Sequence, residues 1–442
     1  MKLKRNILGL SVSFALMVPA IGMANVEPAG GSLFRAATNN ELDKYDITVA
    51  GWAGVTALYA SDKTDDGNIS NGAFLNQEDG IGLDQIGLML CKGMGCLPTS
   101  SFAPAQNVLS RVGPFPGPLG EVQVGFNVTA MYGQDIQFFR VAGIDDYTFD
   151  QDDENKFAVP QFYIDAYIPA FDGMTLMLGS FFTFIGNEIG APFTPPNWFS
   201  TLTYAAQHGP SKHVGALASI KVPTSEDFGL LSFDAGLVAG WNNWDEKRPT
   251  LIGAARWRSP DLATWLDVEF IYGDGEGDAF GAAKGGSPYI AVSSTGDTLN
   301  RFHSSTTLTH ALNPDLQLAA EFIYGFQEAG DVSAAPVFIT EDSGWMGLNV
   351  AARYKLDDNL HMGVRAEWFD DENAANVLWS SVGATGGDVY SLTANLSWSA
   401  NQYIKISPEL RYDTYKGQGA GLFAGGKSDD QFIALLNAVT YF

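Results

Sequence analysis

The sequence predicts an all-β protein, a transmembrane antiparallel up-and-down β-barrel of about sixteen strands, within a range of roughly 14 to 18. Three observations predict this fold class. Apolar and polar residues alternate along many short segments, short connections alternate with long ones, and the chain ends in an apolar run, QFIALLNAVTYF. Most soluble chains end in a polar tail instead, because their last residues have little to pack against.

The first residues describe a secretory signal peptide. MKLKRNILGLSVSFALMVPAIGMA has a basic start, an apolar stretch over residues 7–18 and small residues up to Ala24. A membrane anchor fits less well, because the apolar stretch is shorter than the ~20 residues that a bilayer span requires. We therefore expect residues 1–24 to be cleaved after export, which leaves residues 25–442 as one barrel domain.

Composition excludes several classes of protein. The leader holds three of the 25 basic residues, so the exported chain has 22 against 50 acidic ones, a net charge of −28. This charge argues against nucleic acid as a partner. No exported segment has 18 consecutive apolar residues, which excludes a helical membrane protein. The hydrophobic residues must be distributed in another way.

The hydrophobic residues recur with a period of two. In WLDVEFIYGD, apolar residues occupy every second position from Leu266 to Tyr272. The acidic residues Asp267 and Glu269 lie between them. Successive side chains of a strand point to opposite faces, so such a segment has one apolar and one polar face. The expected strands lie near residues 47–60, 83–91, 120–133, 159–169, 174–186, 212–223, 230–243, 250–258, 263–273, 301–312, 315–327, 345–356, 359–370, 388–399, 402–415 and 431–442.

The connections distinguish a membrane barrel from a soluble sandwich, whose strands also alternate. Even-numbered strands lead to the next strand through short turns rich in Gly, Pro, Asn and Asp, such as AFDG, SPDLA, NPD and SANQ. Odd-numbered strands mostly lead into long loops, which are 61–82, 134–158, 187–211, 274–300 and 371–387. Short turns at one end and long loops at the other are typical of an outer-membrane barrel, with both termini on the periplasmic, short-turn side.

Aromatic residues support a membrane between the two ends. On the apolar face they gather just before the long loops and again near the short turns. The first group is Tyr59, Tyr132, Trp241, Tyr272, Tyr324, Trp368 and Tyr412, and the second is Trp257, Tyr354, Trp398 and Phe442. Aromatic side chains settle at membrane–water interfaces, whereas the aromatic residues of a soluble core would not be expected to gather at strand ends.

The final strand must pair with the first, because an open sheet edge has no hydrogen-bond partners in lipid. A terminal Phe442 with apolar residues at alternate positions over 432–438 resembles the C-terminal signature of bacterial outer-membrane proteins. Thr440 departs from that signature, which usually has an apolar residue there. We expect the protein in the outer membrane of a Gram-negative cell, with the membrane lipids as partners.

A more specific resemblance lies in GSFFTFIGNEI, HVGALASIKV and GLVAGWNNWDEKRPTLIGAARWRSPD. These stretches resemble the OmpL-like beta-barrel porin family, which tends to show Gly-Lys-Phe-x-Thr-x-x-Gly-x-Glu and a later Thr-Gly-Val-Leu-Ala strand leading to Gly-Trp. The matching residues of the first motif are Gly179, Phe181, Thr183, Gly186 and Glu188. Ser180 replaces the Lys, and Val214 precedes Gly215 without the Thr. The resemblance implies a porin-type channel, and porins in general suggest a homotrimer.

Several charged residues face the lumen in this strand assignment. The candidate pore-lining residues are Arg353, Arg365, Arg411, Lys405, Asp267, Glu269, Glu321, Glu367 and Glu409. A barrel of this size is wide enough inside for water, so these charges need not be paired. We expect passive diffusion of small hydrophilic solutes or ions, no cofactor, and a constriction formed by residues 187–211.

Cys91 and Cys96 are the only cysteines and lie in CKGMGC. In an oxidising periplasm we expect a disulfide between them. Residues 92–119 form the one long connection on the short-turn side, so either a strand is misassigned there or the segment folds inward or beneath the barrel. Acidic loops such as DQDDEN do not meet the spacing of a calcium-binding loop, and no metal site is predicted.

Two other functions compete with a channel. Catalysis is disfavoured because no Gly-x-Ser-x-Gly element occurs, and His303 and His310 have opposite parity along one strand. A triad assembled from distant strands would not be visible in the sequence. A non-conducting structural or adhesive barrel stays open, because the aromatic and Pro content of residues 192–207 suits either a constriction in the lumen or an outward contact surface.

Overall fold

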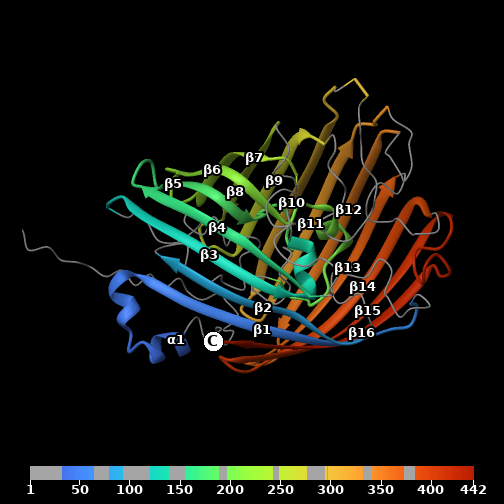
Figure 1. Cartoon of the computed structure of the whole chain (residues 1–442), viewed down its shortest axis with the longest axis horizontal. Helices are drawn as coiled ribbons and strands as arrows, with labels where there is room; N and C mark the ends of the chain where they lie inside the picture. Colours follow the sequence, from blue (N-terminus) through green and yellow to red (C-terminus); the bar gives the residue numbers. More distant parts are fainter. Residues whose placement is uncertain are drawn as a thin grey trace, which may run out of the picture.

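Sixteen strands close into one antiparallel barrel in which each strand pairs with its sequence neighbours and β16 pairs with β1 (Figure 1). The computed structural model describes residues 32–63, 79–92, 120–139, 155–188, 197–241, 248–275, 294–295, 297–331, 341–372 and 384–442. The strands are β1 (Ile47–Ala60), β2 (Gly80–Lys92), β3 (Gln123–Gly133), β4 (Lys156–Ile168), β5 (Met174–Phe182), β6 (Lys212–Val222), β7 (Leu230–Ala239), β8 (Pro249–Arg258), β9 (Thr264–Asp274), β10 (Asn300–Asn313), β11 (Leu316–Gln327), β12 (Ser343–Lys355), β13 (Leu360–Glu372), β14 (Ala384–Asn401), β15 (Ile404–Gly419) and β16 (Asp430–Tyr441). The predicted fold class and all sixteen expected strands are confirmed.

Four short helices accompany the strands in the described residues. They are α1 (Ser32–Ala37), η1 (Glu41–Tyr45), η4 (Gln134–Phe139) and α2 (Tyr204–His208). In the described residues, no helix has both the length and the apolar character needed to cross a membrane.

Several short turns close through a side chain that replaces a backbone acceptor. Between β10 and β11, the Asn313 side-chain oxygen accepts hydrogen bonds from the N–H groups of Asp315 at 2.9 Å and Leu316 at 3.0 Å. Asp357 and Asn401 make the same kind of bond in the turns after β12 and β14. Asn and Asp favour turns for this reason, which is why these connections could be predicted from their composition.

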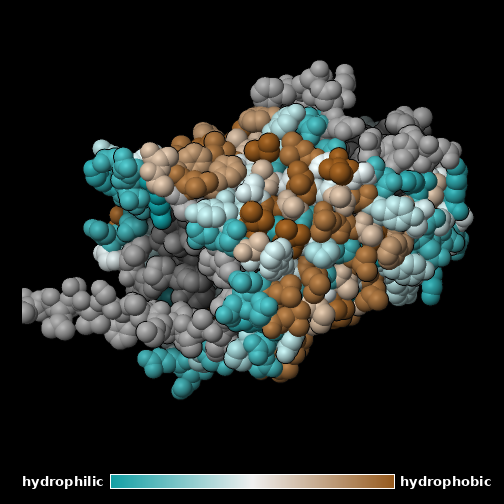
Figure 2. All heavy atoms as spheres, turned by 90° about the horizontal axis from the view of Figure 1, so that it is seen from below, coloured by the Kyte–Doolittle hydropathy of each residue, from teal (hydrophilic) through white to brown (hydrophobic). Residues whose placement is uncertain are grey.

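The two faces of the sheet differ as the alternation predicted. The outward side chains are apolar and exposed, among them Leu237, Phe322, Leu348 and Val350. The inward ones are mostly polar and buried inside the barrel. Figure 2 shows hydrophobic residues across the middle of one face of the barrel, with hydrophilic residues toward both ends. A lipid-facing barrel needs this distribution.

Most of the predicted interfacial aromatic residues face outward. Tyr59 is 54% exposed, and Tyr132, Tyr272 and Tyr412 are also exposed. Trp241 was assigned wrongly, because it is 4% exposed and packs inside the barrel. β7 ends at Ala239, and Gly240 has a left-handed backbone with φ 56°, which breaks the alternation before Trp241.

The seam between β1 and β16 ends at the last residue of the chain. Gly51 and Phe442 exchange two backbone hydrogen bonds, of 2.7 and 2.8 Å. The Phe442 ring lies so close over Gly51 that a Cβ there would be 2.3 Å from the ring. Phe34 of α1 contacts the same ring, with 6.1 Å between centroids, and α1 and the C-terminus lie together (Figure 1). The apolar chain end therefore closes the barrel.

Replacing Phe442 with Ala is expected to lower the free energy of unfolding by about 1–2 kcal/mol, because the ring's contacts with Gly51 and Phe34 are lost. The urea midpoint of the refolded protein in detergent measures this change. Thr440→Ala is the control, since Thr440 is exposed near the same seam and should change stability by less than about 0.5 kcal/mol. Equal midpoints for the two variants would contradict the prediction.

Three predictions fall wholly or partly outside the described residues. The signal peptide over residues 1–24 is one of them, so its cleavage stays a prediction. Cys91 is buried on β2, but Cys96 and residues 93–119 lie outside the described part, so the disulfide and the path of that segment also stay predictions.

Candidate functional site: a segment held inside the barrel

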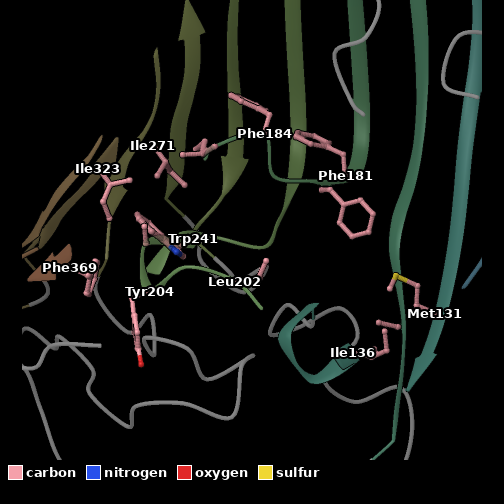
Figure 3. Close-up of a cluster of buried hydrophobic side chains, with 14 of the residues drawn as sticks. Met131, Ile136, Phe181, Phe184, Leu202, Tyr204, Trp241, Ile271, Ile323 and Phe369 are labelled. Carbon is pink, nitrogen blue, oxygen red and sulfur yellow. The ribbon is translucent and has the colours of Figure 1, made fainter. Parts of the chain in front are cut away.

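The chain leaves β5 at Phe182 and enters the barrel before it returns to the wall at β6. We call residues 183–188 and 197–211 the inward segment. Phe184, Leu202 and Tyr204 of this segment are fully buried. Figure 3 shows Leu202 and Tyr204 among buried side chains of the surrounding strands. The predicted constriction, residues 187–211, therefore lies inside the barrel wherever it is described, and residues 189–196 lie outside the described part.

Four wall carboxylates accept hydrogen bonds from the backbone of the inward segment. Their distances to the N–H donors are 2.8 Å for Glu269 with Gly186, 2.9 Å for Glu321 with Asn187, 2.7 and 2.8 Å for Glu409 with Ser200 and Thr201, and 3.1 Å for Glu367 with Ala205. The four carboxylates come from β9, β11, β15 and β13. A buried N–H needs an acceptor, and a carboxylate is a strong one, so the wall fixes the path of the segment.

Arg365 joins the inward segment to β13. Its guanidinium pairs with Glu188, donates to the Thr201 carbonyl oxygen at 3.0 Å, and lies over the Phe199 ring at 4.6 Å. Arg365 is 1% exposed. Glu188 also accepts the Thr203 N–H at 2.8 Å, so one carboxylate ties both halves of the segment to one wall arginine.

Arg411 makes a second attachment, from β15. It donates to the Leu202 carbonyl oxygen at 2.6 Å and to Asp413 at 2.7 Å. Its guanidinium lies 5.1 Å from the centroid of the Tyr204 ring, and that ring stacks on Phe369 of β13. The attachment thus combines charge with apolar packing.

A third charged group lies on the β7–β9 wall. Arg256 bonds Asp234 at 2.9 Å, Asp267 at 3.1 Å and Glu269 at 2.7 Å, and it faces the Phe184 ring of the inward segment. Arg258 adds a 3.0 Å contact to Asp267. The expectation that lumen charges need no partner is wrong for this group, because its members are buried beside the inward segment and a buried charge requires a partner.

All nine predicted pore-lining residues lie at inward positions of their strands, and all except Lys405, which is partly buried, are buried. Glu269, Glu321, Glu367, Glu409, Arg365 and Arg411 contact the inward segment directly. Asp267 pairs with the two arginines of β8. Arg353 and Lys405 lie nearer the short-turn end of the barrel, on β12 and β15. Whether these residues line a conducting path stays a proposal.

Sequence reasoning missed the part played by Glu188. The sequence identifies Glu188 only as a residue that matches the family motif. Its partner Arg365 lies 177 residues away along the chain. The available signal was a single acidic residue in an otherwise uncharged stretch, GSFFTFIGNEIGAPFTPPNWF. In the described residues, no group of three or more His, Cys, Asp or Glu side chains is placed to hold a metal ion.

Comparison with solved structures finds barrels of the same fold. The anion-selective porin from Comamonas acidovorans has 10% identity and a TM-score of 0.52 over 90% of this chain and 99% of that one. The outer membrane channel DcaP of Acinetobacter baumannii has 12% identity and a TM-score of 0.54, over 90% and 97%. OprB of Pseudomonas putida has 11% identity and a TM-score of 0.52, over 92% and 97%. At these identities the likeness shows the fold alone.

The sequence itself identifies the family. A search of the curated proteins found no match. The model of a family described as "Putative beta-barrel porin-2, OmpL-like" matches residues 46–442, which include every strand. This match confirms the resemblance carried by GSFFTFIGNEI and extends it over the whole barrel. The chain belongs to this OmpL-like family of outer-membrane porins.

Proposed function

We propose that this porin is a passive diffusion channel for small hydrophilic solutes or ions, with the inward segment as its constriction. The observation that carries the proposal is the attachment of that segment to the opposite wall by Glu409, Arg365 and Arg411. A segment held inside the barrel by this many charge-assisted bonds narrows the lumen. Solutes that pass it meet polar and charged groups, which disfavour apolar compounds.

The proposal includes no catalytic step. The match to a porin family over residues 46–442 supports this.

Export and assembly complete the proposal. The family places the protein in the outer membrane, and we propose that residues 1–24 direct it there and are removed. A homotrimer is the proposed assembly. One structural neighbour, OmpT of Vibrio cholerae, is described as a trimer form, and at 10% identity it supports the fold rather than the assembly itself.

Single-channel recording of the refolded protein in a planar bilayer tests the proposal. We expect stable open steps and, under a salt gradient, a small reversal potential, because acidic and basic residues are nearly balanced on the inward face. Closure in three equal steps would report a homotrimer. Repeated insertion without conductance would contradict the channel and favour a structural or adhesive barrel.

A further inference from the structure

A short helix also enters the barrel, on the side formed by β2, β3 and β4. η4 begins at Gln134, directly after β3, and packs against these three strands. Its Ile136 is fully buried. Ile136 belongs to the same cluster of buried apolar side chains as Met131 of β3 and as Phe184 and Leu202 of the inward segment (Figure 3). η4 therefore lies inside the barrel.

A β-bulge in β2 forms the place where η4 docks. Gly54 of β1 pairs with Gln85, and the next residue, Val55, pairs with Leu83, so Asp84 is an extra residue on β2. Asp84 and Gln85 are both fully buried, and so both side chains face the inside of the barrel. A strand without a bulge would present only one of the two on this face.

Gly133 brings the start of η4 against this bulge. Its φ is +145°, and a Cβ there would lie 2.3 Å from the Asp84 carbonyl oxygen and 2.7 Å from the Gln85 Cα. Only a residue without a side chain allows so close an approach. The chain therefore turns into η4 in direct contact with the backbone of β2.

Asp135 attaches η4 to the bulge through two buried hydrogen bonds in series. The indole Nε1 of Trp52 donates to Gln85 Oε1 at 2.7 Å, and Gln85 Nε2 donates to Asp135 Oδ2 at 3.1 Å. Trp52 fixes the orientation of the Gln85 amide, which then presents a donor to Asp135. The other oxygen of Asp135, Oδ1, is buried and has no hydrogen-bond partner among the described residues.

The Asp135 carboxyl group lies where a negative charge is unfavourable. The residue is 1% exposed, and in the described part of the chain no ion pair joins it to a basic side chain. The adjacent Asp84 is also buried, and it accepts bonds from the Thr56 hydroxyl at 2.8 Å and the Asn437 amide at 3.3 Å. Burial raises the pKa of Asp135 well above its ordinary value, and the Asp84 carboxyl group raises it further.

The other titratable groups on the strands around η4 do not neutralise Asp135. Lys156 is the basic residue of β4 and pairs in register with Gly133, and among the described residues it makes no ion pair with Asp135. The remaining titratable residues of the three strands are Cys91 and Lys92 at the short-turn end of β2, Tyr132, which is exposed on β3, and Tyr163, Asp165 and Tyr167 in the middle and at the short-turn end of β4.

We propose that η4 is a pH-dependent gate, which is docked in the lumen while the Asp135 carboxyl group is protonated and is released when that group ionises. The inference rests on the proposed function, because the gate regulates the same lumen that the inward segment narrows. Docking is favoured most below the ordinary pKa of a carboxyl group. Each pH unit above it, up to the raised pKa of docked Asp135, disfavours docking about tenfold. Raising the pH therefore favours the wider lumen.

Single-channel conductance of the refolded barrel between about pH 4 and pH 8 tests the gate. We expect the wild-type conductance to rise with pH. Asp135→Asn should keep the low conductance at every pH, because its amide oxygen accepts the same bond from Gln85 and the side chain cannot ionise. Gln85→Ala should show the high conductance at every pH, because η4 loses its donor. Glu341→Gln is the matched control, since it removes an exposed carboxyl group two residues before β12 and should leave the wild-type pH dependence unchanged.

Amide hydrogen exchange of residues 134–139 is a second measurement, and it does not require conductance. At one alkaline pH, η4 should exchange about tenfold or more faster in the wild-type barrel than in Asp135→Asn. At acidic pH the two proteins should exchange at the same rate. The unheated electrophoretic mobility of each variant shows whether it has folded.

Equal pH dependence of conductance in the wild-type and Asp135→Asn barrels would overturn the gate, and so would equal exchange of η4 in both at alkaline pH. Faster exchange of wild-type η4 in a barrel that never conducts would keep the pH-dependent release and refute the channel. A conducting barrel whose current does not change with pH would keep the channel and refute the gate.

Discussion

Replacing Arg365 with Met is expected to lower the free energy of unfolding by about 3–5 kcal/mol, because the substitution leaves the buried Glu188 carboxylate without its partner. It also removes the donor to the Thr201 carbonyl oxygen, so the inward segment loses an attachment to β13. We therefore expect a larger and noisier single-channel conductance. Urea unfolding and bilayer recording measure the two effects.

The control for this prediction removes both charges. In Arg365→Met with Glu188→Gln, no charge is left uncompensated, and much of the lost stability should return. The segment would still lack its ion pair, so the conductance should stay raised. Wild-type stability and wild-type conductance in Arg365→Met alone would contradict the view that Arg365 holds the inward segment.

Gly179→Ala is expected to cost at least about 3 kcal/mol and to reduce the yield of refolded barrel. Gly179 has φ +139°, which L side chains rarely adopt. A Cβ there would lie 2.2 Å from the Phe162 carbonyl oxygen and 2.7 Å from the Tyr163 Cα. Those atoms belong to the backbone of β4, so they can give way only if the pairing of β4 with β5 is disturbed.

Gly120→Ala provides the matched control, because a Cβ at Gly120 has nothing within 4 Å. Its stability should change by less than about 0.5 kcal/mol. The fraction of protein with the mobility of the folded barrel in unheated electrophoresis measures the yield, and the urea midpoint measures stability. If Gly179→Ala refolds like Gly120→Ala, the close approach of β4 and β5 is not required for the barrel to fold.

Some features of the site were visible in the sequence, and others were not. The inward direction of Glu321, Glu367, Glu409 and Arg411 followed from the period of two, which is a property of each strand alone. The prediction that Trp241 faces outward is wrong because it extends the alternation beyond Ala239, the last residue of β7. Gly240, with its left-handed backbone, interrupts the alternation there. Alternation predicts which way a side chain points within a strand. It fails beyond the end of the strand, where the backbone no longer has extended geometry.

The pairing of charges could not be read from the sequence in the same way. In a hydrated lumen, Asp234, Asp267 and Arg256 would need no partners. The barrel instead brings them together beside Phe184 of the inward segment, where all three side chains are buried. Burial, which depends on the whole fold, decides whether a charge must be paired.

The sequence by itself determined the closed barrel, its strands and the membrane-facing surface, because alternation, turn composition and an apolar last strand act between near neighbours or along a single strand. Only the tertiary structure placed the inward segment, residues 183–188 and 197–211, inside the barrel. The bonds that hold it join residues 177 and 208 positions apart, Glu188 with Arg365 and Thr201 with Glu409. No local pattern encodes such a pair, because its two residues are far apart along the chain and are neighbours only in the folded barrel.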